Sequence, residues 1–254
     1  MTGLTVNIVG AGLAGLSAAL ELSREGISVN LISAQPSERA QSVMAEGGIN
    51  ASMNTMGDDD TIREHFEDTL KGGAYIGEVE SIEEMTSSAP FIVEDLIKLG
   101  VPFNNDNGRL VLRYFGGQKK RRTAFSRSST GKLIMSAMID AVRQYEVKGL
   151  VKRFPHHSFE ALDIKDNGCR GVLIRDNYSL KAFKLNGPVI LATGGMNSLF
   201  PGLTTGTTIN TGDVTSYLYS EGLPLSNLEF IQFHPTTSGI EGKRCLISEA
   251  ARGE

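Results

Sequence analysis

The sequence has little cysteine, no long apolar run and no strong charge imbalance. Only Cys169 and Cys245 are cysteines among its 254 residues. Their spacing matches no metal-binding pattern, so we expect two reduced thiols and no metal or iron–sulfur site. No apolar stretch is long enough to span a bilayer, and the net charge of -4 gives no reason to expect a nucleic-acid partner. Met1 leads almost directly into an apolar run without a basic leader, so we expect a cytoplasmic protein that meets membranes only through partners.

The composition is that of an ordinary globular protein, with 40% hydrophobic and 21% charged residues. A chain of 254 residues can bury one substantial core, so we expect one large domain, with or without an appendage. The 29 glycines exceed average usage and indicate tight turns and close backbone approaches.

The first 33 residues have the pattern of a β-α-β unit. Residues 4–9 are β-rich, a helical segment reaches Glu25, Gly26 stops it, and residues 27–32 are β-rich again. The pattern Gly10-Ala11-Gly12-Leu13-Ala14-Gly15 joins the first strand to the helix. There the first glycine permits a tight turn, the second lets the backbone approach a pyrophosphate, and the third lets helix and strand pack closely. Because the helix N-terminus also offers unpaired N–H groups, we expect a dinucleotide to bind here.

The end of the second strand bears on which dinucleotide binds. NAD-dependent enzymes usually carry an acidic residue there to hold the ribose, whereas this strand ends in Ser33. A plain NAD-dependent dehydrogenase is therefore disfavoured and FAD stays open. The residues alone indicate a dinucleotide-binding redox protein.

The rest of the chain alternates helical and strand-like segments. Residues 34–60 show no sustained period, and we interpret this long loop as functional. We expect helices over 61–71, 82–99 and 132–145, and several short strands over 150–192. The run 189–192 predicts a strand buried on both faces.

Several further segments, spread along the chain, carry short motifs. They are residues 42–51, Gly100-Val101-Pro102-Phe103, Phe115-Gly116-Gly117-Gln118, Arg122-Thr123 with Thr130-Gly131, Ala192-Thr193-Gly194-Gly195, Asn210-Thr211-Gly212-Asp213, and the segments 229–236 and 248–254. In this order they resemble the flavoproteins of the fumarate reductase and succinate dehydrogenase family, to which L-aspartate oxidase is related. Residues 42–51 are similar to the segment that wraps the flavin in that family. The resemblance covers nearly the whole chain.

The resemblance implies an α/β fold, a Rossmann-like FAD-binding domain of the glutathione reductase type, with a parallel sheet and a crossover β-meander. We expect this domain over residues 1–247, with its dinucleotide unit at 4–33 and a flavin-wrapping loop at 34–60. Residues 248–254 would begin a capping domain that is cut off, so the capping domain is absent from this chain. Because a substrate clamped between two domains cannot be enclosed by one, we expect the isolated chain to be nearly inactive.

The resemblance also implies which residues hold FAD. Gly47 and Gly48 would let the backbone lie against the flavin. Asp213 matches an acidic FAD-binding residue, although by itself it would more often cap a helix. The full expected set is Gly10, Ala11, Gly12, Leu13, Ala14, Gly15, Ser33, Ser42, Ala45, Gly47, Gly48, Thr193, Gly194 and Asp213. Gln41 stands where many members have a flavin-linking histidine, so we expect noncovalent FAD.

The expected substrate site lies near the end of the chain. His234 is where the family has a histidine that hydrogen-bonds a substrate carboxylate, although an isolated histidine beside proline is more often structural. Ser248 can donate a hydrogen bond to a carboxylate. Glu249 and Arg252 match a proton-relay pair, for which the alternative is a surface ion pair. We expect His234, Glu249 and Arg252 to be catalytic and His234, Ser248 and Glu249 to bind substrate.

Two other features depart from the family or stay open. Ser128 stands where the family usually has an acidic residue. The basic cluster of Arg113 and residues 119–122 would either attract a dicarboxylate or form a solvated face, and we favour the solvated face.

The resemblance implies an FAD-dependent fumarate reductase or succinate dehydrogenase flavoprotein, which exchanges hydride between flavin N5 and a dicarboxylate such as fumarate or succinate. An iron–sulfur subunit would be its partner. L-aspartate oxidase is one alternative, and a truncated, non-catalytic flavin-binding module is another.

Overall fold

The computed structural model describes residues 3–115, 118–166, 168–234, 236–240 and 243–247. These residues form two compact units, each of which is described by itself. Within the described residues, the first unit comprises the chain up to Met44 and Met138–Leu246, and the second comprises Ala45–Ala137 with Ile247.

The first unit begins with the predicted β-α-β element. β1 (Thr5–Val9) leads into α1 (Leu13–Arg24) and then β2 (Ser28–Ser33). The apolar face of α1, with Leu16 and Leu20, is buried beside the two strands. Gly26 has φ of 74°, a left-handed conformation that ends the helix at low cost. The expected strands and helix are confirmed to within one or two residues.

A four-stranded parallel sheet is the centre of the first unit, with the strand order β12-β1-β2-β8. β8 (Val151–Pro155) follows α4 (Thr130–Val147), and β12 (Val189–Leu191) returns to the other side of β1. The chain therefore leaves β1 towards β2 on one side and reaches β12 on the opposite side. Such a reversal of strand order opens a crevice at the carboxyl ends of the strands.

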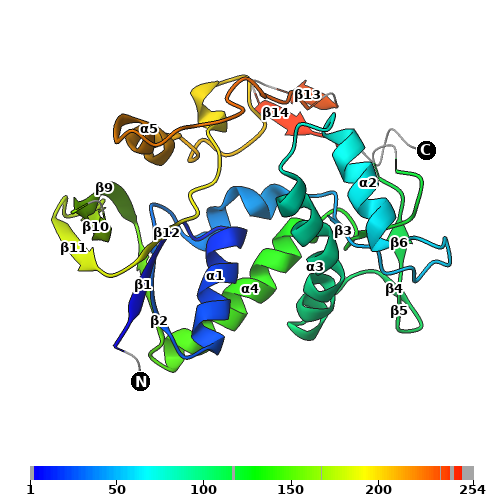
Figure 1. The fold of residues 1–254 in the computed structure, drawn as a ribbon, viewed down its shortest axis with the longest axis horizontal. Coiled ribbons are helices and arrows are strands. Elements are labelled where there is room, and N and C mark those ends of the chain that lie inside the picture. Colours follow the sequence, from blue (N-terminus) through cyan, green and yellow to red (C-terminus); the bar gives the residue numbers. More distant parts are fainter. Residues whose placement is uncertain (1–2, 116–117, 167, 235, 241–242, 248–254) are drawn as a thin grey trace. The chain divides into compact units, whose positions relative to one another are not determined.

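An antiparallel meander connects β8 to β12. It consists of β9 (His157–Lys165), β10 (Gly168–Asp176) and β11 (Ala182–Asn186), with β10 in the middle (Figure 1). Val172 and Ile174 of β10 are fully buried in one cluster with Val9, Ile32 and Phe154 of the parallel sheet. This shared core fixes the meander against the sheet.

One expectation for the sheet is wrong. The run 189–192 predicted a strand buried on both faces, but β12 lies at the edge of the sheet and Ile190 is 37% exposed. Val189 and Leu191 pack against the cluster shared with the meander. Because side chains alternate along a strand, Ile190 points to the opposite face.

The last part of the first unit carries short elements. The 3₁₀ turns Ser37–Arg39 and Gln41–Met44 follow β2, and a third one spans Asn197–Leu199. α5 (Asp213–Ser220) is joined to the meander because the Tyr217 hydroxyl accepts a hydrogen bond from Leu162 N–H at 3.1 Å. β13 (Thr237–Ile240) pairs with β14 (Lys243–Leu246).

The second unit combines two helices with short antiparallel strands. α2 (Ile62–Gly72) begins after Thr61, whose hydroxyl accepts a hydrogen bond from Glu64 N–H, and α3 (Val79–Lys98) contacts α2. β3 (Ile49–Asn50), β7 (Thr123–Ala124) and β6 (Leu112–Arg113) form one sheet. β4 (Asn105–Asp106) pairs with β5 (Arg109–Leu110). The expected helices over 61–71, 82–99 and 132–145 are confirmed as α2, α3 and α4.

In the described residues, no helix combines the length and the apolarity that crossing a membrane requires. Nor do these residues contain a group of three or more His, Cys, Asp or Glu side chains placed to hold a metal ion.

Candidate dinucleotide-binding site

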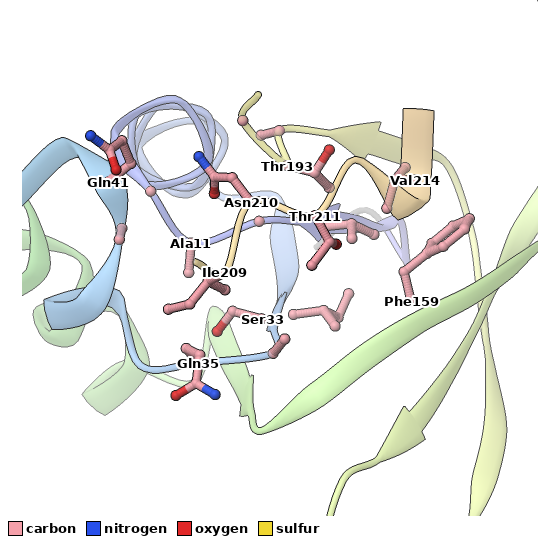
Figure 2. A pocket seen from close by; sticks show the side chains of 18 of the residues that line it. Ala11, Ser33, Gln35, Gln41, Phe159, Thr193, Ile209, Asn210, Thr211 and Val214 are labelled. Atoms are coloured by element: carbon pink, nitrogen blue, oxygen red, sulfur yellow. The ribbon is translucent and has the colours of Figure 1, made fainter. Parts of the chain in front are cut away.

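A cavity of about 520 Å³ lies at the carboxyl ends of β1, β2 and β12, entirely within the first unit. The turn after β1, the loop after β2 and the segment after β12 form its walls, together with the start of β9 and the first turns of α5 (Figure 2). Its position is the crevice that the reversal of strand order creates. Its volume lies in the range of pockets that hold small molecules and cofactors.

The three glycines of the turn after β1 have different roles. A Cβ on Gly10, where φ is 112°, would lie 2.1 Å from the carbonyl oxygen of Ala192, and one on Gly15 would lie 1.8 Å from that of Gly10. The fold itself therefore requires these two glycines. A Cβ on Gly12 would meet only ordinary contacts, the nearest being Ser42 Oγ at 3.6 Å. Gly12 lines the cavity, and the fold would tolerate a side chain there. The absence of a side chain therefore matters for a ligand, which can approach the backbone closely at this position.

The N-terminus of α1 faces the same cavity. Leu13 N–H donates to Ser42 Oγ at 3.2 Å, and Leu16 N–H bonds the carbonyl of Gly12 at 2.9 Å. The backbone N–H groups of Ala14 and Gly15 have no acceptor among the described residues. Unpaired amides and the positive end of the helix dipole form an anion site, which suits a pyrophosphate.

The opposite wall comes from the segment after β12 and from α5. Gly194 has φ of 76°, and a Cβ there would lie 3.3 Å from Asn210 Nδ2. Gly212, in the left-handed conformation, is the N-cap of α5, so Asp213 is the first helical residue and does not cap the helix through its side chain. The Asp213 carboxylate borders the cavity and can accept hydrogen bonds from hydroxyl groups.

The structure brings together most of the expected cofactor residues of the first unit. The cavity is lined by Gly10, Ala11, Gly12, Leu13, Ala14, Ser33, Ser42, Thr193, Gly194 and Asp213. Gly15 lies one position beyond them and supports the turn. Sequence reasoning missed Phe159, Thr207 and Asn210 as lining residues. Asn210 stood in a quoted motif, whereas Phe159 and Thr207 carry no local signal.

Ala45, Gly47 and Gly48 belong to the second unit. The carbonyl of Ala45 accepts from Gly131 N–H at 2.7 Å, and that of Gly47 accepts from Arg113 Nη2 at 2.6 Å. Gly48 has φ of 139°, and a Cβ there would lie 2.5 Å from the carbonyl oxygen of Ala124. The close pairing of β3 with β7 thus requires glycine at position 48, whether or not a flavin binds.

The expected substrate residues are only partly within the described residues. Ser248, Glu249 and Arg252 lie outside them. His234 precedes β13, and its Nδ1 is 3.1 Å from the carbonyl oxygen of Thr236 and 3.3 Å from the Thr236 hydroxyl. His234 is not among the residues that line the cavity, and its role in substrate binding stays a prediction.

The basic cluster is engaged within the second unit, and the interpretation as a solvated face is wrong for Arg122. Its side chain is 1% exposed and contacts Asp60 at 2.7 Å and Asp68 at 3.0 Å. Arg121 forms an ion pair with Asp58, which lowers the pKa of that carboxyl to about 2, mainly through the side-chain hydrogen bond. These contacts are structural.

The fold and the cavity define an α/β protein built to bind a dinucleotide. Residues 5–254 match the FAD binding domain family, and the chain belongs to that family. The predicted FAD-binding fold is confirmed.

Relatives extend this result. The succinate dehydrogenase flavoprotein subunit of Bacillus subtilis (strain 168) is 39% identical over 258 residues, which cover 100% of this chain and 44% of that protein. A mitochondrial succinate dehydrogenase flavoprotein of Xenopus laevis is also 39% identical, over 97% of this chain and 37% of its own length. The predicted resemblance to this group of flavoproteins is confirmed.

Solved structures agree. A flavoprotein chain of E. coli quinol fumarate reductase superposes with a TM-score of 0.90 at 30% identity, covering 99% of this chain and 43% of that one. The Mycobacterium smegmatis Sdh1 complex gives a TM-score of 0.88 at 30% identity, covering 98% and 44%. The chain therefore spans less than half the length of the relatives that it matches.

Proposed function

We propose that this chain holds FAD noncovalently in the cavity of the first unit, as part of a flavoprotein that interconverts a dicarboxylate pair such as fumarate and succinate. The observation that carries the proposal is the cavity at the reversal of strand order, bordered by Gly12 and by the unpaired amides at the start of α1. Relatives from bacteria and a vertebrate named as succinate dehydrogenase flavoproteins support the choice of reaction.

The residues of the chain fit FAD. The N–H groups of Ala14 and Gly15 would bind the pyrophosphate, and Gly12 would let it approach the backbone. Asp213 and Asn210 would bond the hydroxyl groups of the cofactor. Bound FAD supplies two-electron chemistry by hydride exchange at flavin N5. By resemblance, Ala45, Gly47 and Gly48 carry the same cofactor-binding role.

The chemistry of position 41 supports noncovalent binding. A carboxamide is not a nucleophile, so Gln41 cannot form the bond that a histidine forms with the flavin. The side chain is also engaged, since its Oε1 accepts a hydrogen bond from Thr207 N–H at 2.7 Å. Acid precipitation of the full-length protein should leave the yellow colour in the supernatant. Flavin that stays in the pellet would contradict this part of the proposal.

The substrate contacts proposed by resemblance are His234 and Ser248, which would bind a carboxylate, and Glu249 with Arg252, which would pass a proton. Hydrogen-bond donors fixed at the site would stabilise the charge that develops on the substrate. The partner proposed is an iron–sulfur subunit that delivers electrons, and the proposed location is the cytoplasm. A relative whose name describes a complex, the Mycobacterium smegmatis Sdh1 complex, supports partner subunits in general.

The test uses the full-length protein as its gene encodes it, reconstituted with FAD. We expect fumarate reduction with reduced viologen as donor. Turnover of aspartate with oxygen, and none of fumarate, would instead identify an L-aspartate oxidase. Tight FAD binding without either turnover would identify a non-catalytic flavin-binding module, and absence of FAD binding would overturn the proposal altogether.

A further inference from the structure

The loop from Thr204 to Ile209 closes one side of the cofactor cavity. Its backbone is held by its own hydroxyl groups, since Gly206 N–H donates to Thr204 Oγ1 at 2.9 Å and Ile209 N–H donates to Thr207 Oγ1 at 3.3 Å. Thr207 and Ile209 both line the cavity. The loop is therefore a defined piece of the cavity wall.

Two side-chain amides fasten this loop at Thr207. Gln41 Oε1 accepts a hydrogen bond from Thr207 N–H at 2.7 Å, and Asn197 Nδ2 donates to the Thr207 carbonyl oxygen at 3.4 Å. Both backbone groups of one residue are thus bound by side chains from other segments. The bond from Gln41 joins residues 166 positions apart and connects the wall that follows β2 to the wall that precedes α5.

Gly206 supplies an independent observation of the same arrangement. A Cβ at this position would lie 1.9 Å from Asn197 Nδ2 and 3.1 Å from Gln41 Oε1. Its φ is not in the left-handed region, so the backbone conformation does not require glycine. A methyl group at this position would fit only if the Asn197 amide moved and the Gln41 amide shifted slightly.

Gln41 stands at the edge of the cavity. In Figure 2 its side chain lies on the side of the cavity away from Phe159. The next residue, Ser42, accepts the N–H of Leu13 at the start of α1. The Gln41–Thr207 hydrogen bond would therefore pass over one end of a ligand that is bound along the cavity.

We propose that the Gln41–Thr207 hydrogen bond is a clasp that retains bound FAD, so that Gln41 is a positioning residue that governs cofactor release. The proposal rests on FAD being the occupant of the cavity. The clasp must open before the loop can move aside, so breaking it should speed dissociation. One net hydrogen bond predicts an increase of about three- to tenfold, since tenfold corresponds to about 1.4 kcal/mol.

The experiment measures FAD dissociation from the full-length holoprotein, by the fluorescence of FAD released after dilution. Gln41→Met removes the acceptor at nearly constant shape and should release FAD about three- to tenfold faster. Gln41→Glu keeps an acceptor for the same N–H and should stay within about twofold of the natural protein. Gln144→Met is the matched control on the exposed side of α4, and its release rate should not change. The turnover number of Gln144→Met at saturating FAD should also equal that of the natural protein.

A double-mutant cycle gives the second test. Gly206→Ala should displace the amides and accelerate release by itself. Combined with Gln41→Met it should give less than the product of the two single effects, because the added methyl also crowds Gln41 Oε1, 3.1 Å away, and part of both changes falls on the same hydrogen bond. Fully additive effects, or an unchanged release rate in Gln41→Met, would overturn the clasp while FAD binding stood. A natural protein that binds no FAD would overturn both the clasp and the proposed function.

Discussion

Arg122 and Asp60 form an ion pair that is wholly enclosed in the second unit. Arg122 Nη2 lies 2.7 Å from Asp60 Oδ1, and the two side chains are 1% and 0% exposed. The backbone carbonyl of Arg122 accepts a hydrogen bond from Ala51 N–H at 2.7 Å. The pair thus connects the segment just before α2 to β7, and through β7 to the strand that follows Gly47 and Gly48.

Removing one partner of this pair should strongly destabilise the protein. Arg122→Met leaves the buried Asp60 without its main counterion, and Asp60→Asn removes the closer of the two carboxylates that contact Arg122. We expect each substitution to lower the free energy of unfolding by about 3–5 kcal/mol. Denaturation by urea, followed by circular dichroism, measures the loss. The control is Arg63→Met, which breaks an exposed pair with Glu67 and should cost less than about 1 kcal/mol. Equal losses in the buried and exposed variants would contradict this account.

His65 predicts how stability depends on pH. Its ring is buried, and its Nδ1 has no hydrogen-bond partner among the described residues. Burial lowers the pKa of His65, as does the Arg122 guanidinium, while Asp60 and Asp68 oppose the shift. The folded state therefore favours the neutral ring, and the unfolded chain binds the proton first as pH falls.

The stabilising contribution should be complete above about pH 6.5 and should diminish as pH falls below that value towards the lowered pKa. His65→Leu should flatten the slope of unfolding free energy against pH in that window. A profile identical to that of the natural protein would show that His65 does not titrate on unfolding.

The β1-α1-β2 element could be predicted from the sequence because its signals are local. The glycines of the first turn and the stop at Gly26 lie within a few residues of the elements that they define. The edge position of β12 could not be predicted in this way, since Asn7 pairs with Val189 across most of the chain. The burial of Arg122 could not be predicted either, since its partners Asp60 and Asp68 lie far from it in the sequence and its neighbours Lys119, Lys120 and Arg121 suggest a solvated face.

In the cofactor site, too, residues in local motifs could be predicted and residues held by long-range contacts could not. Motifs in register located Ser42, Thr193 and Asp213, all of which border the cavity. Thr207 was missed because its contact with Gln41 joins distant segments through a side chain, which leaves no periodic pattern. Nothing in the composition marks the return of the chain to the first unit at Met138.

Alanine substitutions at Gly48 and Gly57, which both have a positive φ, compare the cost of backbone strain alone with the cost of strain plus a steric clash. Gly57 has φ of 70° and nothing within 4 Å of an added Cβ, so Gly57→Ala should cost about 1–2 kcal/mol from the backbone alone. Gly48→Ala adds a contact of 2.5 Å with the Ala124 carbonyl oxygen, so β3 and β7 must separate and the loss should be clearly larger. Urea denaturation of both variants measures the difference. A Gly48→Ala variant no less stable than Gly57→Ala would show that β3 and β7 yield easily.

Gly12 and Gly15 separate folding from cofactor binding. Gly15→Ala places a Cβ 1.8 Å from the carbonyl oxygen of Gly10, so the first turn cannot form and soluble folded protein should be lost. Gly12→Ala meets no close contact in the protein, so the variant should fold with a loss of about 1 kcal/mol or less. Its methyl group would occupy the cavity wall beside the free amides of α1, and FAD affinity should fall at least about tenfold, or about 1.4 kcal/mol. Titration of the apoprotein with FAD by flavin fluorescence measures this, and undiminished affinity in a folded Gly12→Ala variant would place the pyrophosphate elsewhere.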